Sequence, residues 1–397
     1  MIVDAGDVAL RLKRLADELE EKGRLRDPAW RRAFLAVRRH VFVPRFWRDE
    51  EPGAFPARWR MIDNATVDHP EWLDAVYSDR TLATELTGIP AKGAPGMHPQ
   101  VTSSTTMPSL VMAMLEALDV HDGMDVLEIG TGTGYNAALL CERLGEAHVT
   151  TIDVGPELTA LASVRLDAHD YHPHVVTGDG AEGVSDRAPF DRIVATCGLD
   201  AVPQAWIDQT RDGGKLLVNV LGPWNAFAMV LLTVHGDTAS GPFLAQSGGF
   251  MPRRTDPERA HDYTVAVQRV ASGPVDEWYS MLDPQTLYTD PTFGLIAQTK
   301  LAGVGSRQIY VDDSENLGTE MATGDGTSWA VVHHNRHGER GFHASQAGRR
   351  RLWDEIEALH REWLGHGRPA HDRYGLTVGG EAPPVLWLDG PDGPQSF

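Results

Sequence analysis

Cysteine is scarce in this sequence: its 397 residues include only two, Cys141 and Cys197. Both stand inside apolar runs that are typical of a protein core. A disulfide framework needs more cysteines in a shorter secreted chain, so none is expected here. No apolar run approaches the ~18 residues of a membrane helix. Residues 8–21 form a charged helical pattern rather than an apolar signal region. These absences predict a cytoplasmic protein without a membrane partner.

Positive charge is also in short supply. Lys and Arg number 36 against 56 for Asp and Glu, which gives a net charge of −20. Affinity for nucleic acids depends on contacts of Lys and Arg with phosphates, so we expect no nucleic-acid partner. Apolar residues make up 42% of the chain, enough for a sizeable core. The length is typical of two domains, or of one large domain with an extension.

The sequence has no recognisable metal-binding or Ser-His-Asp signature. Histidines cluster at 169–174 and 333–343, but without the Cys or His-Glu-x-x-His context of a zinc site. We therefore expect surface or loop histidines and no metal. The Arg run at 349–351 is interpreted as a solvated helix face. A nucleophilic Cys197 would need a paired His, so we interpret it as a small apolar wall residue.

The first hundred residues divide into a helical part and an irregular part. Apolar residues recur at helical spacing from Leu10 to Leu19. Asp27-Pro28 is expected to start a second helix, with Asp as the N-cap, that ends before Val43-Pro44. Residues 48–100 contain scattered Pro and Gly and are expected to be loops. We assign residues 1–75 to an N-terminal helical region with an insert.

Strands and helices alternate after Pro108, which is expected to open a helix. Predicted strands lie at 125–129, 149–152, 174–177, 190–196, 214–220 and 227–234, with helices at 135–144, 156–169 and 203–210. This alternation predicts an α/β fold with a parallel sheet and right-handed crossovers. The segment at 227–234 has no helix before it and could pair antiparallel. Residues 76–254 form the predicted core domain.

Residues 255–397 show a different pattern. Strand-like runs lie at 308–311, 329–333, 376–378 and 385–388, and an amphipathic helix is predicted at about 348–364. We expect a small α/β extension, and its sequence shows no recognisable chemistry.

A glycine loop after the strand at 125–129 carries the main chemical signal. Gly130, Gly132 and Gly134 allow the backbone to approach a ligand closely where a helix begins. Glu128 precedes the loop, and Asp153 ends the next strand, where an acid can accept hydrogen bonds from both ribose hydroxyls. The expected cofactor contacts are Glu128, Gly130, Thr131, Gly132, Gly134, Tyr135, Asp153, Asp179 and Gly180.

The alternative ligand is a dinucleotide. Its fingerprint needs G-x-G-x-x-G, and Tyr135 stands where the last glycine would be. S-adenosylmethionine has no pyrophosphate, and its charged amino-acid end can use the glycine loop instead. Asp179, in Gly178-Asp179-Gly180, is either a turn residue or an acceptor for an adenine amino group. Its place after a third strand favours adenine, so the pattern favours S-adenosylmethionine as the cofactor.

Several segments together resemble the protein-L-isoaspartate O-methyltransferase family. The similarity covers about residues 8–254 and follows the family's order and spacing. It is carried by Arg38–Pro44, Tyr77–Asp79, Val126–Tyr135, Phe190–Val194, Val202–Asp208, Gly213–Leu216 and Phe250–Pro252. The resemblance implies a Rossmann-like class I methyltransferase fold and transfer of a methyl group to an aspartyl or isoaspartyl carboxylate.

The run Ser104-Thr105-Thr106 stands where the family has a motif whose serine lies at the substrate carboxylate. The resemblance therefore implies that Thr106, with Thr105 and Ser104, forms the catalytic segment. Thr106 keeps the hydroxyl but adds a methyl group, and its alternative role is at the N-cap of the helix opened by Pro108. A carboxylate is already ionised at neutral pH, so the reaction needs no general base.

The insert at 48–72 and the C-terminal extension are additions to the family pattern. Similar extensions occur in a subset that serves peptide-modification gene clusters, notably those for graspetides (ester- or amide-crosslinked peptides) and some lanthipeptides. Residues 386–392 resemble that subset. We therefore predict a peptide partner, a cyclised precursor whose methylated Asp closes to an aspartimide. Two alternatives stay open: a repair enzyme for damaged proteins, and a binding module without catalysis.

Overall fold

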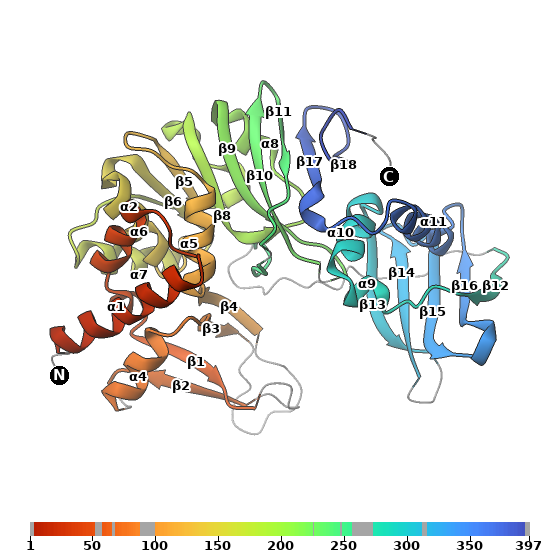
Figure 1. Cartoon of the computed structure of the whole chain (residues 1–397), viewed down its shortest axis with the longest axis horizontal. Coiled ribbons are helices and arrows are strands. Elements are labelled where there is room, and N and C mark those ends of the chain that lie inside the picture. The colour runs from red at the N-terminus through yellow and green to blue at the C-terminus, as the bar shows by residue number, and fades with distance from the viewer. Residues whose placement is uncertain are drawn as a thin grey trace.

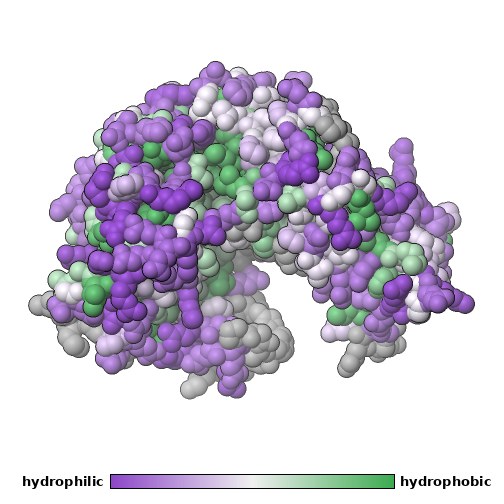
Figure 2. Space-filling model, viewed as in Figure 1, coloured by the Kyte–Doolittle hydropathy of each residue, from purple (hydrophilic) through white to green (hydrophobic). Residues whose placement is uncertain are grey.

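The computed structural model describes residues 4–51, 58–65, 68–87, 100–224, 226–246, 248–255, 273–311 and 316–393. Three sheets are present, of four, nine and five strands. Figure 1 shows the nine-stranded sheet in the middle, the N-terminal helices and the four-stranded sheet on one side, and the five-stranded sheet on the other. On the face shown in Figure 2, most of the coloured surface is hydrophilic, and the molecule is hollowed between the two flanks.

The N-terminal helices follow the predicted pattern. Helix α1 spans Ala5–Glu21 and buries Leu12, Leu15 and Leu19. Helix α2 (Pro28–Ala36) starts as expected, because the Asp27 side chain accepts a hydrogen bond from the Ala29 amide. This helix ends earlier than expected, and a separate short helix, α3, spans Arg39–Phe42.

The prediction of loops at 48–100 is wrong for the described part of that stretch. Its strands belong to a four-stranded antiparallel sheet of order β2-β1-β3-β4, accompanied by helix α4 (His69–Val76). The strands are β1 (Arg45–Asp49), β2 (Trp59–Asp63), β3 (Leu82–Thr87) and β4 (Gln100–Thr105). Strands of five or six residues give little periodicity, so their long-range pairing is not visible in the local sequence.

The central sheet has the order β18-β17-β11-β10-β9-β8-β5-β6-β7. Strands β7, β6, β5, β8 and β9 pair in parallel, and the remaining strands pair antiparallel. Their bounds are β5 (Val126–Ile129), β6 (Val149–Asp153), β7 (His174–Thr177), β8 (Phe190–Leu199), β9 (Thr210–Val220), β10 (Ala228–His235) and β11 (Thr238–Pro242). The six predicted strands and the antiparallel pairing of the last one are confirmed, whereas β11 was not foreseen.

Helices connect the parallel strands, as the crossover rule requires. They are α6 (Tyr135–Leu144), α7 (Pro156–Asp167) and α8 (Gln204–Asp208), while two short 3-10 helices join β7 to β8. Helix α5 (Pro108–Ala117) precedes β5. Gly145 ends α6 in a positive-φ conformation, in agreement with the predicted end of that helix.

The C-terminal region contributes to two sheets. Strands β12 (Asp276–Ser280), β13 (Val304–Tyr310), β14 (Leu317–Thr323), β15 (Trp329–Arg336) and β16 (Phe342–Ala347) form the five-stranded sheet. Helices α9 (Thr286–Thr289), α10 (Pro291–Lys300) and α11 (Leu352–Gly365) accompany it. Strands β17 (Tyr374–Gly379) and β18 (Val385–Leu388) return to the central sheet, where β17 pairs with β11.

One hydrophobic core joins these two parts. It contains Ile193 and Leu216 of the central sheet together with Phe293 and Trp353 of the C-terminal helices. The C-terminal region is therefore integrated with the core domain rather than tethered to it. None of the helices in the described ranges is both long and apolar enough to cross a membrane.

Candidate functional site

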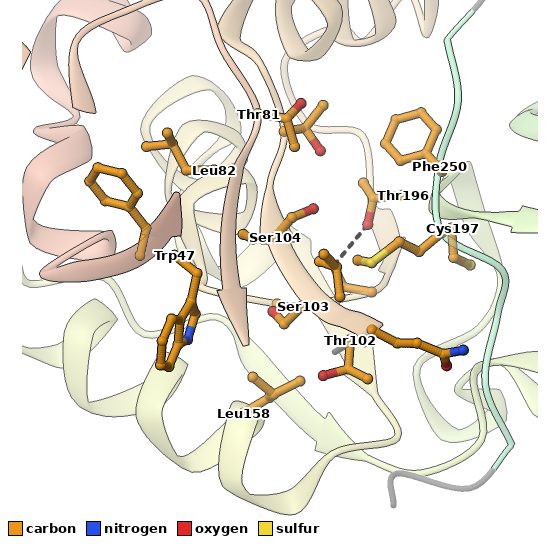
Figure 3. A pocket seen from close by; sticks show the side chains of 18 of the residues that line it. Trp47, Thr81, Leu82, Thr102, Ser103, Ser104, Leu158, Thr196, Cys197 and Phe250 are labelled. Atoms are coloured by element: carbon orange, nitrogen blue, oxygen red, sulfur yellow. Dashed lines mark hydrogen bonds between the residues drawn. The ribbon is translucent and has the colours of Figure 1, made fainter. Parts of the chain in front are cut away.

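A cavity of ≈1200 Å³ lies between the four-stranded sheet and the carboxyl ends of the central parallel strands. Its lining comes from the four-stranded sheet, the glycine loop, the residues after β6 and β8, and the segment 249–254. Figure 3 shows Ser104, Thr196, Cys197 and Phe250 around it. Ligand sites of open α/β sheets lie at this end of the strands, so the cavity is the candidate active site.

The glycine loop forms the floor of this cavity. Gly130, Gly132 and Gly134 have φ values of +102°, +52° and +88°, which side-chain-bearing residues rarely adopt. A Cβ atom at Gly130 would lie 2.5 Å from the hydroxyl oxygen of Thr196. Gly130 and Gly132 line the cavity. Gly134 instead caps α6 and packs against Ala162 of α7.

Asp153 stands at the end of β6 and lines the cavity, as predicted. Its two carboxylate oxygens accept hydrogen bonds from the amides of Gly132 (2.9 Å) and Gly155 (3.1 Å). These contacts fix the carboxylate beside the glycine loop. Since each carboxylate oxygen has two lone pairs, both oxygens retain capacity to accept a hydrogen bond from a ligand.

Glu128 and Thr131 lie one layer behind the cavity. The carboxylate of the fully buried Glu128 accepts hydrogen bonds from Asn136 and Thr151, each at 2.7 Å. The Thr151 hydroxyl in turn bonds to that of Thr131 at 2.7 Å. Burial raises the pKa of Glu128 to about 7, although the hydrogen bonds from Thr151 and Asn136 oppose this. Glu128 and Thr131 line a smaller neighbouring cavity of ≈50 Å³.

Tyr135 faces the N-terminal helices. Its ring centroid lies 5.9 Å from that of Phe42 and 5.8 Å from the guanidinium carbon of Arg39. The side chain is buried and lines only the smaller cavity. Tyr135 therefore joins the loop to the N-terminal core.

Asp179 and Gly180 follow β7, and Gly180 lines the main cavity. Asp179 caps the short helix Gly180–Glu182 by accepting from the Ala181 amide at 2.9 Å. It also accepts a 2.6 Å hydrogen bond from Arg253. The indole of Trp206 donates to the Gly180 carbonyl at 2.8 Å, which fixes the loop from below.

Arg253 was missed by the sequence interpretation. It belongs to the segment after β11, which pairs with β8 through hydrogen bonds of Gly198 to Met251 and of Arg253 to Gly198. The only sequence signal was its position next to the motif at 250–252. The pairing brings Arg253 to Asp179, 74 residues away along the chain.

The predicted catalytic segment divides between two faces of strand β4. Ser104 and Thr106 line the main cavity, whereas Thr105 is buried on the opposite face, in register with Leu82 of β3. Among the described residues, neither the Ser104 nor the Thr106 hydroxyl has a hydrogen-bond partner in the protein. The hydroxyls of Thr102 and Ser103 are engaged, with Glu85 and with Thr84.

Two buried contacts hold this segment. The guanidinium of Arg39 donates to the carbonyls of Thr106 and Arg80, each at 3.1 Å, and to those of Val76 and Ser78. Asp79 accepts a 2.9 Å hydrogen bond from the Ser109 amide at the start of α5. Burial opposes ionisation, but the bonds from Ser109 and Lys22 keep the pKa of Asp79 below its ordinary value.

Thr196 and Cys197 of β8 form a wall of the cavity, directly after the part of the strand that pairs with β5. The Thr196 hydroxyl donates to the carbonyls of Ile129 (3.0 Å) and Gly130 (2.9 Å), so it fixes the start of the glycine loop. Burial raises the pKa of Cys197 to about 12, so its thiol stays protonated at neutral pH. This is consistent with its interpretation as a wall residue. Within the described ranges no three His, Cys, Asp or Glu side chains are grouped to hold a metal ion.

Comparisons with known proteins agree with this geometry. The family model described as protein-L-isoaspartate(D-aspartate) O-methyltransferase matches residues 93–234. The protein-L-isoaspartate O-methyltransferase of Thermococcus sibiricus is 31% identical over 254 residues, which cover 63% of this chain and 96% of the relative. The enzyme of the same name from Ignicoccus hospitalis is 42% identical over 163 residues, covering 41% of this chain and 74% of the relative.

A solved structure of the same name has a similar fold. It aligns with 96% of this chain and 100% of its own length, with a TM-score of 0.56 and 21% sequence identity. The similarity in fold therefore extends into the C-terminal region, beyond the part matched by the Thermococcus relative.

Proposed function

This chain belongs to the protein-L-isoaspartate O-methyltransferase family, and on that premise we propose that it methylates an Asp-type carboxylate in a cyclised peptide. The class I methyltransferase fold predicted from the sequence is confirmed, and the chain is an S-adenosylmethionine-dependent carboxyl methyltransferase. The finer proposal concerns the substrate. It names a ribosomal precursor peptide, already cyclised, as the carrier of the carboxylate.

The residues around the cavity fit S-adenosylmethionine. Gly130 and Gly132 border the cavity with positive φ values and without side chains, so their backbone suits the amino-acid end of the cofactor. Asp153, fixed by the Gly132 and Gly155 amides, suits the ribose hydroxyls. Asp179 and Gly180 suit the adenine amino group, with Arg253 as the counterion of Asp179.

Glu128, Thr131, Gly134 and Tyr135 support the cofactor site from behind. The chain of hydrogen bonds from Asn136 through Glu128 and Thr151 to Thr131 fixes the base of the loop. Gly134 and Tyr135 anchor the start of α6 to α7 and to the N-terminal helices. We therefore assign these four residues to positioning.

The reaction requires alignment of the substrate carboxylate with the methyl group rather than acid-base catalysis. S-adenosylmethionine supplies an electrophilic sulfonium methyl group, which a carboxylate oxygen takes as the carbon–sulfur bond breaks. The substrate carboxylate is ionised at neutral pH, so no protein group has to remove a proton. The enzyme holds the oxygen in line with the methyl group and excludes water.

Two uncommitted hydroxyls carry the proposal. Ser104 and Thr106 face the cavity without hydrogen-bond partners among the described residues, and Ser104 lies next to the glycine loop. Two hydroxyl donors beside the cofactor site suit a carboxylate acceptor. Thr106 is held from behind by Arg39, which makes it the better-fixed donor.

A preformed, bulky substrate is supported by the surroundings of the cavity. At ≈1200 Å³ it exceeds the ~300–1,000 Å³ of a usual small-molecule site, so it has room for the cofactor and a peptide segment. The β1–β2 hairpin adds a wall on the substrate side. After methylation, the next backbone nitrogen attacks the ester carbonyl and expels methanol, which closes an aspartimide.

Mass spectrometry tests the proposal directly. The protein is incubated with S-adenosylmethionine and either a linear isoaspartyl peptide or the cyclised product of a precursor peptide encoded beside its gene. The cyclised peptide should gain one methyl group and then lose methanol. Equal or better methylation of the linear peptide would instead support the alternative, a repair enzyme for damaged proteins.

A further inference from the structure

Three residues lie in one row across the four-stranded sheet. Trp47 of β1 is in register with Ala83 of β3, and Ala83 is in register with Ser104 of β4. Residues directly opposite one another in a sheet share a face. All three line the cavity, and Figure 3 shows Trp47 and Ser104 on the two sides of β3. Because the Ala83 side chain is small, a slot remains between Ser104 and Trp47, and it ends at the indole ring of Trp47.

The slot runs away from the cofactor side of the cavity. The Ser104 carbonyl lies 3.8 Å from the position of a Cβ atom on Gly132, so β4 borders the glycine loop. Neighbouring strands lie ~4.8 Å apart, which places the Trp47 backbone ~10 Å beyond that of Ser104. A carboxylate held at Ser104 would therefore have its flanking side chain over Ala83, against Trp47.

A second tryptophan extends this wall. Trp59 of β2 is directly opposite Asp49 of β1, two residues along from Trp47 and on the same face. Its indole nitrogen is buried and has no hydrogen-bond partner among the described residues. Since this nitrogen is buried, Trp59 borders the cavity with the apolar part of its ring.

The hairpin that carries both tryptophans is fixed from its other face. Arg48 and Arg60, in register with each other, both donate to Glu71 of α4, at 3.1 and 2.8 Å. Phe46 and Ile62, also paired, are fully buried against the N-terminal core. The wall is therefore part of a packed layer and keeps its position when a ligand enters.

We propose that Trp47, Ala83 and Trp59 form a specificity subsite for one bulky apolar or aromatic side chain adjacent to the methylated aspartate. The inference rests on the proposed function, since it takes Ser104 as a neighbour of the reacting carboxylate. Aromatic walls favour apolar and aromatic groups through large contact areas.

The test uses two peptide series, linear isoaspartyl and lactone-cyclised, in which the residue after the aspartate is Gly, Leu, Trp or Lys. Wild-type kcat/KM should be about 10- to 100-fold higher for Leu or Trp than for Gly or Lys. Trp47→Ala should remove most of this preference through KM, so that the Leu and Trp peptides approach the kcat/KM of the Gly peptide. Ala83→Leu, which fills the slot, should have the same effect, so the test does not depend on the folding of one variant.

Tyr310→Ala is the control, because Tyr310 of β13 lies on the five-stranded sheet, is an exposed aromatic residue and is not part of the cavity lining. Binding of unreactive Asn-containing peptides in the presence of S-adenosylhomocysteine, by calorimetry, gives a second readout.

A wild-type enzyme that accepts all flanking residues equally would overturn the subsite and leave the proposed function intact. A higher Kd of Trp47→Ala for S-adenosylhomocysteine would also overturn it, since the wall would then serve the cofactor. If neither peptide series gains a methyl group but the peptides still bind with affinities that depend on the flanking residue, the result would contradict the proposed function. It would leave the subsite intact.

Discussion

The fully buried guanidinium of Arg39 donates a 3.1 Å hydrogen bond to the main-chain carbonyl of Thr106. It also bonds to three carbonyls between Val76 and Arg80. One side chain thus ties the N-terminal helices to the segment that borders the cavity. Burial lowers the pKa of Arg39 to about 10, and the side chain stays charged at neutral pH.

Arg39→Lys should therefore destabilise the protein and misplace Thr106. A lysine ammonium has no planar fork and only three N–H donors for these four carbonyls, so at least one carbonyl would lose its donor at a cost of about 1–3 kcal/mol. We expect the free energy of unfolding, measured in denaturant, to fall by at least about 1–3 kcal/mol. The same change at the exposed Arg32 of α2 is the control and should cost less than about 0.5 kcal/mol. Equal effects at the two positions would contradict the positioning role.

Asp153→Asn should weaken cofactor binding. The substitution removes the negative charge and one acceptor while keeping the shape of the side chain beside Gly132 and Gly155. Hydrogen bonds to a charged group contribute about 1.5–3 kcal/mol. The Kd for S-adenosylmethionine, measured by calorimetry, should rise roughly 10- to 100-fold. Asp186→Asn, at an exposed site, is the control, and an unchanged Kd for Asp153→Asn would remove Asp153 from the cofactor site.

Thr106→Val should lower activity and Thr106→Ser should preserve it. Valine keeps the shape of threonine but removes the hydroxyl that faces the cavity. Loss of a hydrogen bond to a carboxylate should reduce kcat/KM by roughly 10- to 100-fold. The Kd for S-adenosylmethionine should stay the same in both variants. Full activity of the valine variant would show that the hydroxyl does not contact the substrate.

Glu128 should make stability depend on pH. Burial raises its folded-state pKa to about 7, whereas the pKa of an unfolded Glu is about 4.3. Its contribution is therefore fully present below about pH 4.3 and is lost as pH rises toward 7, because the unfolded state ionises first. One unit of pKa shift corresponds to about 1.4 kcal/mol, so the loss is about 4 kcal/mol.

Glu128→Gln isolates this effect, since glutamine can still accept a hydrogen bond from Asn136 and form one with the Thr151 hydroxyl. The variant should gain stability relative to the wild type between pH 5 and pH 7, measured by denaturant unfolding at each pH. Its Kd for S-adenosylmethionine should change far less than that of Asp153→Asn. Identical pH slopes for the two proteins would show that Glu128 is ionised throughout this range.

The local patterns of the sequence were enough for the cofactor side of the site. The glycine loop and Asp153 are each encoded within a few residues of a strand end, so periodicity and turn chemistry reveal them. The substrate side depends on contacts across long stretches of chain. Trp47 meets Ala83 only through strand pairing, and Arg253 meets Asp179 across 74 residues. No short-range pattern carries such information.

The same limit explains the C-terminal region. The strand at 376–378 was foreseen, but its partner was not, because an apolar run does not say which sheet it joins. In the structure β17 pairs with β11, more than a hundred residues earlier in the chain. The amphipathic helix, by contrast, carries its own signal at helical spacing, and α11 confirms it.

The measurement that tests the central claim most directly is the mass of peptides after incubation with the protein and S-adenosylmethionine. A peptide with an Asp-type carboxylate should gain one methyl group, and the cyclised precursor should gain it faster than a linear isoaspartyl peptide and then lose methanol. Failure of every carboxylate peptide to gain a methyl group, by a protein that binds the cofactor, would contradict the account.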